Sequence, residues 1–279
     1  MRDFSGDTAL LSLNTATVQP QWTLAQCIDG CARHGIGGIA PWRDKLAECG
    51  VQRAARLIRD AGLRVTGLCR GGMFPAATPA ERRAALDDNR KAVDDAAAIG
   101  AECLILVVGG LPEGSKDIAG ARMQVRDGIA ALLDHAHAAG MPLAIEPLHP
   151  MYAADRACVN TLKQANDLCD SLGEGVGVAV DVYHVWWDPD LDAELARAGA
   201  ADRILGFHVS DWLVPTADLL LDRGMMGDGV IDIPKIRGWV EDAGYDGASE
   251  VEIFSEDNWW RREPDDVLAT CIERHRSAV

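Results

Sequence analysis

Four polar side chains in the second half of the chain each stand at or near the end of a short apolar run. They are Glu146, Asp181, His208 and Glu252. The runs before them have the length and apolar content of buried β-strands. Three carboxylates and one imidazole form a ligand set that suits one divalent cation, with Mn²⁺, Mg²⁺ or Co²⁺ favoured and Zn²⁺ possible. We therefore expect a metal site formed by parallel strands that lie side by side.

The last apolar run contains two glutamates. Glu250 and Glu252 are two positions apart, so both point to the same side of a strand. We place Glu252 in the site because it stands nearer the end of the run. Glu250 then lies deeper or pairs with another charged group, and the sequence leaves open whether it shares the role of Glu252.

Apolar runs alternate with longer amphipathic stretches along almost the whole chain. The expected strands are 10–13, 38–40, 65–68, 103–108, 143–145, 176–180, 204–207 and 249–253. The expected helices are 23–34, 45–61, 79–99, 119–139, 160–171, 190–199, 233–243 and 264–276. Thr78-Pro79 and Asp232 mark helix starts, and glycines follow most helical stretches. The alternation predicts an α/β fold, a single (β/α)8 TIM barrel that occupies residues 1–279 as one domain.

The main alternative fold is a doubly wound sheet that binds a dinucleotide. Residues 35–40 match the pattern Gly-x-Gly-x-x-Ala as letters. A dinucleotide loop follows a strand and opens a helix, whereas these residues close a helix and lead into a strand. We therefore expect no nucleotide cofactor.

Composition excludes several kinds of partner. The 27 basic residues against 43 acidic ones give a net charge of −16, which repels nucleic acid. The first residues contain no sustained apolar segment, so we expect neither a signal peptide nor a membrane anchor. The eight cysteines include no Cys-x-x-Cys pair and are interpreted as buried thiols. A cytoplasmic enzyme fits these features.

Five segments resemble the xylose isomerase-like TIM barrels, which include sugar isomerases, ketose 3-epimerases and inosose dehydratases. The segments are IEPLHP (145–150), VAVDVYHVWWDP (178–189), GFHVSDW (206–212), Arg223 with GDGVID (227–232), and GYDGASEVEIF (244–254). The resemblance implies that the four residues named first hold one metal. It also implies that His184 and Arg223 face substrate oxygens, and that Asp211 steadies His208 or a pocket water.

A DNA-repair branch of the same superfamily looks similar in this half of the chain. That branch uses a three-zinc cluster with further histidines on the third and fourth strands. This chain has Cys69-Arg70 and Val108-Gly109 at those places. Together with the acidic charge, this difference argues against an apurinic endonuclease.

The expected chemistry is proton transfer beside a carbonyl. A metal that binds a hydroxy-carbonyl sugar stabilises an enediolate, and Glu146 and Glu252 could remove and return the proton. We expect a metal-dependent isomerase or epimerase of a small unphosphorylated keto sugar or polyol, active in carbohydrate metabolism. A dehydratase (lyase) of a keto-inositol or 3-keto sugar is the alternative. A non-catalytic sugar-binding barrel is a third possibility.

His149 has two interpretations: it could reach a substrate hydroxyl, or it could be a plain loop histidine. Tyr152 and Arg156 are further loop residues that are candidates for the pocket. His275 lies in the last helical stretch and is expected at the surface. The resemblance implies a homo-oligomer, either a dimer or a tetramer.

Overall fold

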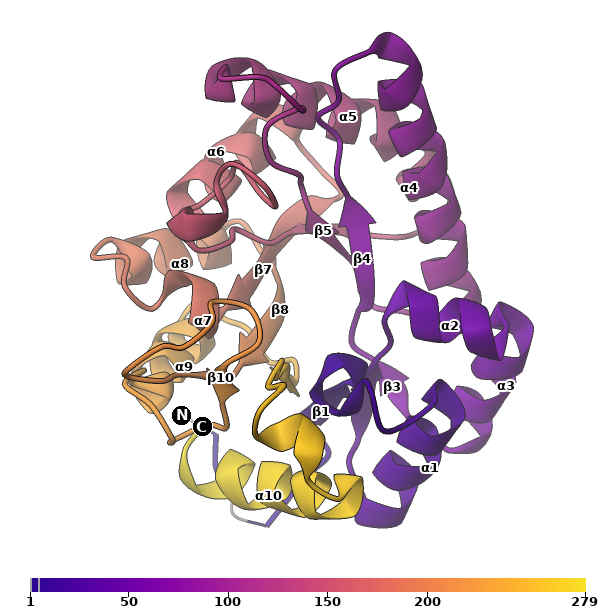
Figure 1. The fold of residues 1–279 in the computed structure, drawn as a ribbon, viewed down its shortest axis with the longest axis vertical. Coiled ribbons are helices and arrows are strands. Elements are labelled where there is room, and N and C mark those ends of the chain that lie inside the picture. The colour runs from indigo at the N-terminus through magenta and orange to yellow at the C-terminus, as the bar shows by residue number, and fades with distance from the viewer. Residues whose placement is uncertain (1, 5) are drawn as a thin grey trace.

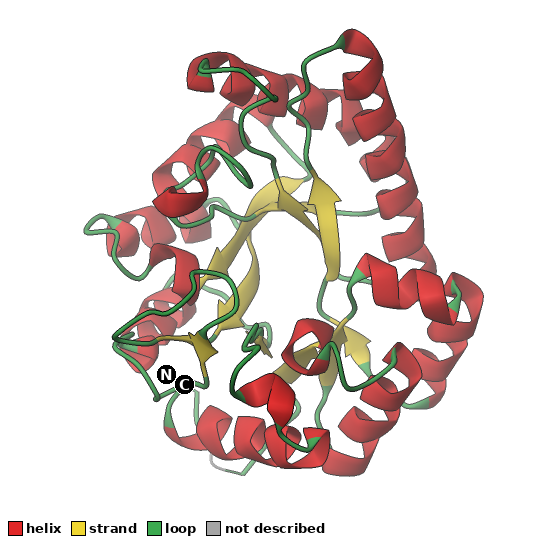
Figure 2. Cartoon of the chain, in the orientation of Figure 1, coloured by secondary structure: helices red, strands yellow, loops and turns green. Residues whose placement is uncertain are grey.

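The computed structural model of the chain describes residues 2–4 and 6–279. Parallel strands form one sheet that curves into a nearly closed barrel, and helices surround it (Figures 1 and 2). The strands of this sheet are β1 (Leu11–Asn14), β2 (Gly38–Ala40), β3 (Arg64–Val65), β4 (Leu68–Gly72), β5 (Leu104–Val107), β6 (Leu143–Ile145), β7 (Val176–Asp181), β8 (Ile204–Val209) and β11 (Ser249–Val251). The predicted TIM barrel is confirmed.

The strand order shows how the barrel closes. It runs β3-β2-β1-β11-β8-β7-β6-β5-β4, with every neighbouring pair parallel. The two ends of this order, β3 and β4, are separated in the chain only by Thr66 and Gly67. They are therefore two parts of the third strand, predicted as one run at 65–68. The first part pairs with β2 and the second with β5.

The helices follow the strands in alternation. They are α1 (Leu24–His34), α2 (Arg43–Cys49), α3 (Val51–Asp60), α4 (Pro79–Ile99), α5 (Ile118–Ala138), α6 (Leu162–Leu172), α7 (Val182–Val185), α8 (Leu191–Ala200), α9 (Ile233–Asp242) and α10 (Pro264–Ser277). Short 3-10 helices lie at η1 (Thr15–Val18), η2 (Pro150–Tyr152) and η3 (Trp259–Arg261). The helix predicted at 45–61 is broken, because Gly50 between α2 and α3 has φ +82° and ψ 124°, outside the helical region.

The predicted helix starts have the expected caps. The Thr78 side chain accepts a hydrogen bond from the amide of Glu81, whose carboxylate accepts one from the Thr78 amide. Asp232 accepts a hydrogen bond from the amide of Lys235. These local interactions fix the residues at which α4 and α9 begin.

The barrel interior has an apolar side and a polar side. Small apolar residues of the β4 to β7 half pack together inside it: Cys69, Cys103, Ile105, Ala144 and Ala179. The opposite half carries buried polar residues of β1, β11 and the turn between β3 and β4: Ser12, Asn14, Thr66 and Glu250. The larger apolar core lies between the strands and the helices. Polar groups inside a barrel need partners, and these side chains bond to one another: Ser12 to Thr66, and both Thr66 and Asn14 to Glu250.

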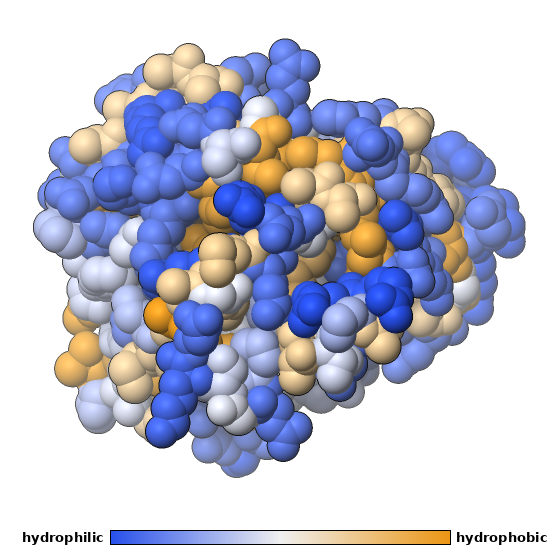
Figure 3. Space-filling view, turned by 90° about the horizontal axis from the view of Figure 1, so that it is seen from above, coloured by the Kyte–Doolittle hydropathy of each residue, from blue (hydrophilic) through white to orange (hydrophobic). Residues whose placement is uncertain are grey.

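The outer surface agrees with the composition. The face drawn in Figure 3 is mainly hydrophilic, with apolar residues exposed between the charged ones. Within residues 2–4 and 6–279, none of the helices has both the length and the apolar character that a bilayer crossing requires. All eight cysteines are free thiols, and every one except Cys49 is buried.

One residue expected at the surface is inside the protein. His275 of α10 is fully buried and stacks on Phe4, with ring centroids 4.2 Å apart. The prediction was wrong because helical periodicity does not show what covers a helix face. Phe4 of the N-terminal segment covers this one, and the carbonyls of Arg2 and Val279 both accept hydrogen bonds from the Arg237 guanidinium, which brings the two segments together.

Candidate active site

The carboxyl ends of four strands bring the predicted metal ligands together. Glu146 directly follows β6, Asp181 ends β7, His208 lies near the end of β8, and Glu252 directly follows β11. Each is buried, and one ligand atom from each lies within 4.8 Å of the others. Pairing of Asp181 with His208 across β7 and β8 places these two side by side. A buried group of this composition could hold a metal ion.

His208 is held between two carboxylates. Its Nδ1 lies 3.0 Å from Oε1 of Glu146, and its Nε2 lies 3.6 Å from Oε1 of Glu250. Burial lowers the pKa of His208, but the charges of Glu250 and Glu146 outweigh burial and raise it well above the ordinary value. Nε2 has no hydrogen-bond partner among the described residues. The imidazole therefore has one nitrogen directed to each carboxylate.

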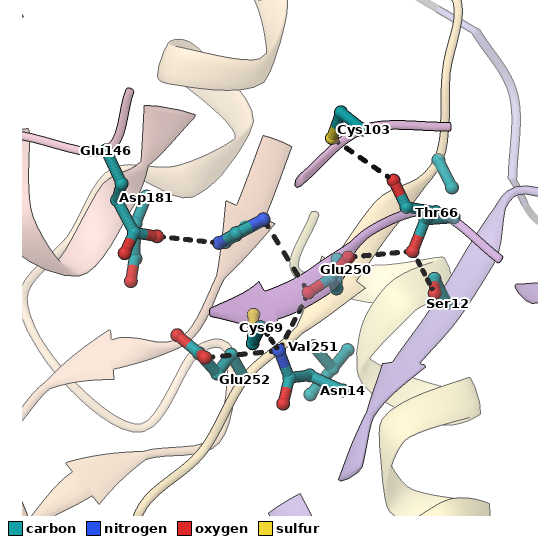
Figure 4. A network of polar contacts seen from close by, with 12 residues as sticks. Ser12, Asn14, Thr66, Cys69, Cys103, Glu146, Asp181, Glu250, Val251 and Glu252 are labelled. Atoms are coloured by element: carbon teal, nitrogen blue, oxygen red, sulfur yellow. Dashed lines mark hydrogen bonds and ion pairs between the residues drawn. The ribbon is translucent and has the colours of Figure 1, made fainter. Parts of the chain in front are cut away.

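Glu250 belongs to a buried polar network beneath the four ligands (Figure 4). Its carboxylate accepts hydrogen bonds from Thr66 Oγ1 at 2.7 Å and from Asn14 Nδ2 at 2.8 Å. The same Asn14 amide donates to Glu252 Oε1 at 3.1 Å. Glu250 thus lies deeper than Glu252, as the sequence allowed, and Asn14 links the two glutamates.

Arg223 places a positive charge among the ligands. Its Nη1 donates to Asp181 Oδ2 at 3.0 Å and to Glu252 Oε2 at 3.1 Å. It comes from β10 (Arg223–Gly224), which pairs antiparallel with β9 (Asp211–Trp212). The guanidinium lies 4.4 Å from the ring centroid of Tyr183, which limits its movement. This hairpin was not predicted, because each of its strands has only two residues.

The ligand group fits a divalent cation on electrostatic grounds. Burial raises the pKa of Glu252 to about 8, Arg223 opposes this, and the Glu146 carboxylate adds to it. The raised pKa values of Glu252 and His208 show that protons, together with the Arg223 charge, offset the carboxylates in the metal-free site. A cation bound by Glu146, Asp181, His208 and Glu252 would displace these protons and supply the positive charge in their place.

His184 lies in the same pocket as Arg223 and beside it. It is buried in α7, and its Nε2 is 3.2 Å from Nη2 of Arg223 and 3.6 Å from Oδ2 of Asp181. Burial is the main cause that lowers the pKa of His184, to about 3, and the Arg223 charge contributes. His184 is therefore a neutral imidazole that faces the pocket.

Two predicted residues lie elsewhere. Asp211 was expected to steady His208 or a pocket water, and its carboxylate accepts hydrogen bonds from the backbone amides of Gly227, Gly229 and Ile231 at 2.8 to 3.0 Å. It therefore anchors the 227–231 loop. His149 packs against Trp212, with ring centroids 4.9 Å apart. It is not among the residues that line the pocket over the ligands.

The pocket above the ligands contains further polar side chains. Glu146, Glu252, His184 and Arg223 line it together with Arg70, Tyr152 and Arg156. The hydroxyl of Tyr152 is buried and has no hydrogen-bond partner among the described residues. Burial raises the pKa of Tyr152, so the phenol stays protonated and can donate a hydrogen bond. The pocket is small and combines acidic, basic and neutral donors.

Comparison with known proteins agrees with this geometry. The sequence profile of the xylose isomerase-like TIM barrel family matches residues 28–271. The chain belongs to this family. Comparison with curated proteins finds no significant match.

Three solved structures show how this xylose isomerase-like barrel relates to others. Protein SMc04130 from Sinorhizobium meliloti 1021 is 62% identical, with coverage of 96% of this chain and 98% of that one and a TM-score of 0.96. The IOLI protein, solved with a bound zinc atom, is 19% identical, with coverage of 96% and 97% and a TM-score of 0.84. D-allulose 3-epimerase from Methylomonas sp. is 20% identical, with coverage of 96% and 97% and a TM-score of 0.77. The similarity to the IOLI protein and to the Methylomonas enzyme shows a shared fold only.

Sequence reasoning missed two residues of this xylose isomerase-like site. Asn14 ends β1 and contacts two glutamates, but an asparagine after an apolar run also suggests a turn. Arg70 lines the pocket from β4. In the sequence it stood out only because the DNA-repair branch has a histidine on this strand and this chain does not. Its place near the carboxyl end of the third strand was the signal that could have identified it.

Proposed function

We propose that the protein is a divalent-metal-dependent isomerase or epimerase of a small keto sugar or keto polyol. The observation that carries this proposal is the pair Glu146 and Glu252. The two glutamates come from β6 and β11, line one pocket, and share a ligand group with Asp181 and His208. Such a pair can remove a proton from one carbon and return it to the same carbon or to its neighbour.

The metal would be held by Glu146, Asp181, His208 and Glu252. When bound, a divalent cation supplies Lewis acidity that makes the carbon beside a carbonyl more acidic. Mn²⁺, Mg²⁺ and Co²⁺ suit three carboxylates and one imidazole, and the zinc in the IOLI structure supports Zn²⁺ as a further candidate. The name of the Methylomonas enzyme supports epimerisation as the reaction type.

The chain's own residues divide the remaining tasks. Glu146 and Glu252 line the pocket and can take up and return the proton there. Arg223 and the neutral His184 lie side by side in the pocket and can donate hydrogen bonds to substrate oxygens. These donors would fix the carbonyl and hydroxyl groups beside the two glutamates.

Exchange of solvent deuterium into substrate tests this function. The metal-loaded protein is incubated with a panel of keto sugars and keto polyols in D₂O, and products are identified by NMR. Glu146→Gln and Glu252→Gln should each abolish exchange while the fold is retained, because neither amide can act as a base. Glu256→Gln, at an exposed position, is the matched control. Retained exchange in both pocket variants contradicts the mechanism, and metal binding without exchange on any substrate favours a sugar-binding barrel.

A dehydratase on the same site is the second candidate. Loss of a hydroxyl needs a proton donor beside the leaving oxygen, and the unpartnered phenol of Tyr152 in the pocket could supply it. A product lighter by one water molecule, formed by the native protein and abolished by Tyr152→Phe, would support this reaction. An isomeric product formed equally by both proteins contradicts it.

A further inference from the structure

Two arginines in the pocket have no side-chain hydrogen bond or ion pair with any residue that the structure describes. Arg70 comes from β4, and Arg156 comes from the loop after η2. Both are partly buried. Across residues 2–4 and 6–279 they are the only arginines that are not exposed and yet form neither a hydrogen bond nor an ion pair through the side chain.

Their neighbours show how unusual this is for the chain. Arg223, in the same pocket, binds two carboxylates, and Arg43 binds the Asp88 carboxylate through two nitrogens at 2.8 and 2.9 Å. The protein has 43 acidic residues against 27 basic ones, so partners are abundant. Two partly buried guanidinium groups have lost hydration that no described carboxylate or carbonyl replaces, although the Arg156 guanidinium lies 5.6 Å from the ring centroid of Tyr152.

The two arginines also act on each other. Burial and the positive charge of Arg156 are the two main causes that lower the pKa of Arg70. Like charges held close together in a partly buried pocket repel, and an anion bound between them relieves the repulsion. A guanidinium presents a planar set of donors that matches a carboxylate or a phosphate.

We propose that Arg70 and Arg156 form a subsite for an anionic substituent of the substrate, so that the true substrate is an acidic keto sugar or polyol. This inference rests on the proposed function for the position of the carbonyl, next to Glu146 and Glu252. The anionic end then points away from the ligand group and towards the two arginines. A carboxylate or a phosphate ester supplies the same chemistry.

Binding of matched ligands to the Mn²⁺-loaded protein tests the subsite. Isothermal titration calorimetry compares D-fructose with D-fructuronate and D-fructose 6-phosphate, and D-tagatose with D-tagaturonate and D-tagatose 6-phosphate. Within each trio only the group at one end differs. We expect at least one acid to bind about 10-fold or more tightly than its neutral counterpart, the scale of a charge-assisted contact. Preference for the uronate identifies a carboxylate subsite, and preference for the phosphate ester a phosphate subsite.

Charge removal then shows which residues cause the preference. Arg70→Gln and Arg156→Gln should each reduce the ratio of acid affinity to neutral-sugar affinity about 10-fold, and this ratio cancels any effect common to both ligands. Arg83→Gln, on the exposed face of α4, removes the same charge outside the pocket and should have no effect. Lysine replacement, which retains the charge and loses the planar fork, serves where a glutamine variant does not fold, and should weaken acid binding by a smaller factor.

The possible results separate this proposal from the proposed function. No preference for an acid in either trio, or a preference that survives both substitutions, overturns the subsite. Arginine-dependent acid binding without deuterium exchange supports the subsite and contradicts the isomerase. Exchange into neutral sugars, combined with no preference for either acid, supports the isomerase and overturns the subsite.

Discussion

Nε2 of His208 lies 3.6 Å from Oε1 of Glu250, on the side of the imidazole opposite to Glu146. Residue pairing between β8 and β11 sets this arrangement, because His208 and Glu250 are direct partners in the register. Glu250 is itself fixed by Thr66 and Asn14. A carboxylate behind a ligating histidine sets its tautomer and orientation. Glu250 therefore lies where it can position His208, the role that the family resemblance implied for Asp211.

Glu250→Gln should weaken metal binding without unfolding the protein. The amide keeps the volume of the side chain but loses the charge that orients His208, and such changes reduce metal affinity about 10- to 100-fold. Titration of the metal-free variant with Mn²⁺ measures the affinity, and Glu256→Gln is the control. An unchanged dissociation constant would mean that Glu250 stabilises the barrel interior and does not affect metal binding.

Loss of a ligand should reduce the metal content of the purified protein. Asp181→Ala and His208→Ala each remove one donor from a group whose ligand atoms lie within 4.8 Å of one another. Elemental analysis of protein purified without added metal measures the occupancy. Asp192→Ala, exposed on α8, should retain the native content. Native occupancy in both ligand variants would count against their assignment.

Removal of metal should lower thermal stability. Without a cation, the carboxyl groups of Glu146, Asp181 and Glu252 are buried close together, and burial and the Glu146 charge raise the pKa of Glu252 to about 8. A ligand that binds only the folded state stabilises it by about 2.7 kcal/mol at a free concentration 100 times its dissociation constant. The melting temperature should fall with EDTA and rise with each increment of Mn²⁺ added back. A melting temperature that changes neither with EDTA nor with added Mn²⁺ would show that the four residues hold no cation.

The sequence predicted the site residues that stand at the ends of successive strands. Asp181 and Glu252 follow apolar runs in β7 and β11, and a parallel barrel places such ends at one mouth. Arg223 was placed by resemblance alone, since the two-residue strand that carries it has no periodicity. The split of the third strand was also invisible, because Thr66 and Gly67 fit one continuous apolar run.

Long-range contacts account for the remaining errors. The partners of Asp211 are three backbone amides 16 to 20 residues further along the chain, and no side-chain pattern shows where a loop amide points. The partner of His275 is Phe4, at the other end of the chain. Spacing rules describe neighbours within one element, so contacts that depend on the folded path of a loop or a terminus lie beyond them.

Asp211→Ala should loosen the 227–231 loop and leave metal binding intact. The substitution removes a buried carboxylate that accepts three loop amides, and charge-assisted hydrogen bonds of this kind contribute roughly 1.5–3 kcal/mol each. Limited proteolysis should cleave this loop faster than in the native protein, while elemental analysis finds the native metal content. Loss of metal with an intact loop would restore the expectation that Asp211 steadies His208.

His275 should make the protein less stable in mild acid. Burial is the main cause that lowers its pKa to about 4, and the charge of Arg237 adds to this. In the unfolded chain the pKa of a histidine is about 6.5. Between these two values the unfolded state binds a proton that the folded state does not, so the free energy of unfolding falls as the pH falls. The loss approaches about 1.4 kcal/mol per pH unit and totals roughly 2–3 kcal/mol.

His275→Leu removes this titrating group and should flatten the pH dependence of the free energy of unfolding between pH 6.5 and 4. Urea unfolding of both proteins in EDTA, which excludes changes in metal binding, gives the free energies. Above pH 7 the imidazole is neutral in both states of the native protein, so the difference between the two proteins should be constant there. Parallel curves over the acid range would show that His275 takes up a proton as readily in the folded protein as in the unfolded chain. Its stacking on Phe4 would then leave the ring open to water, contrary to its complete burial.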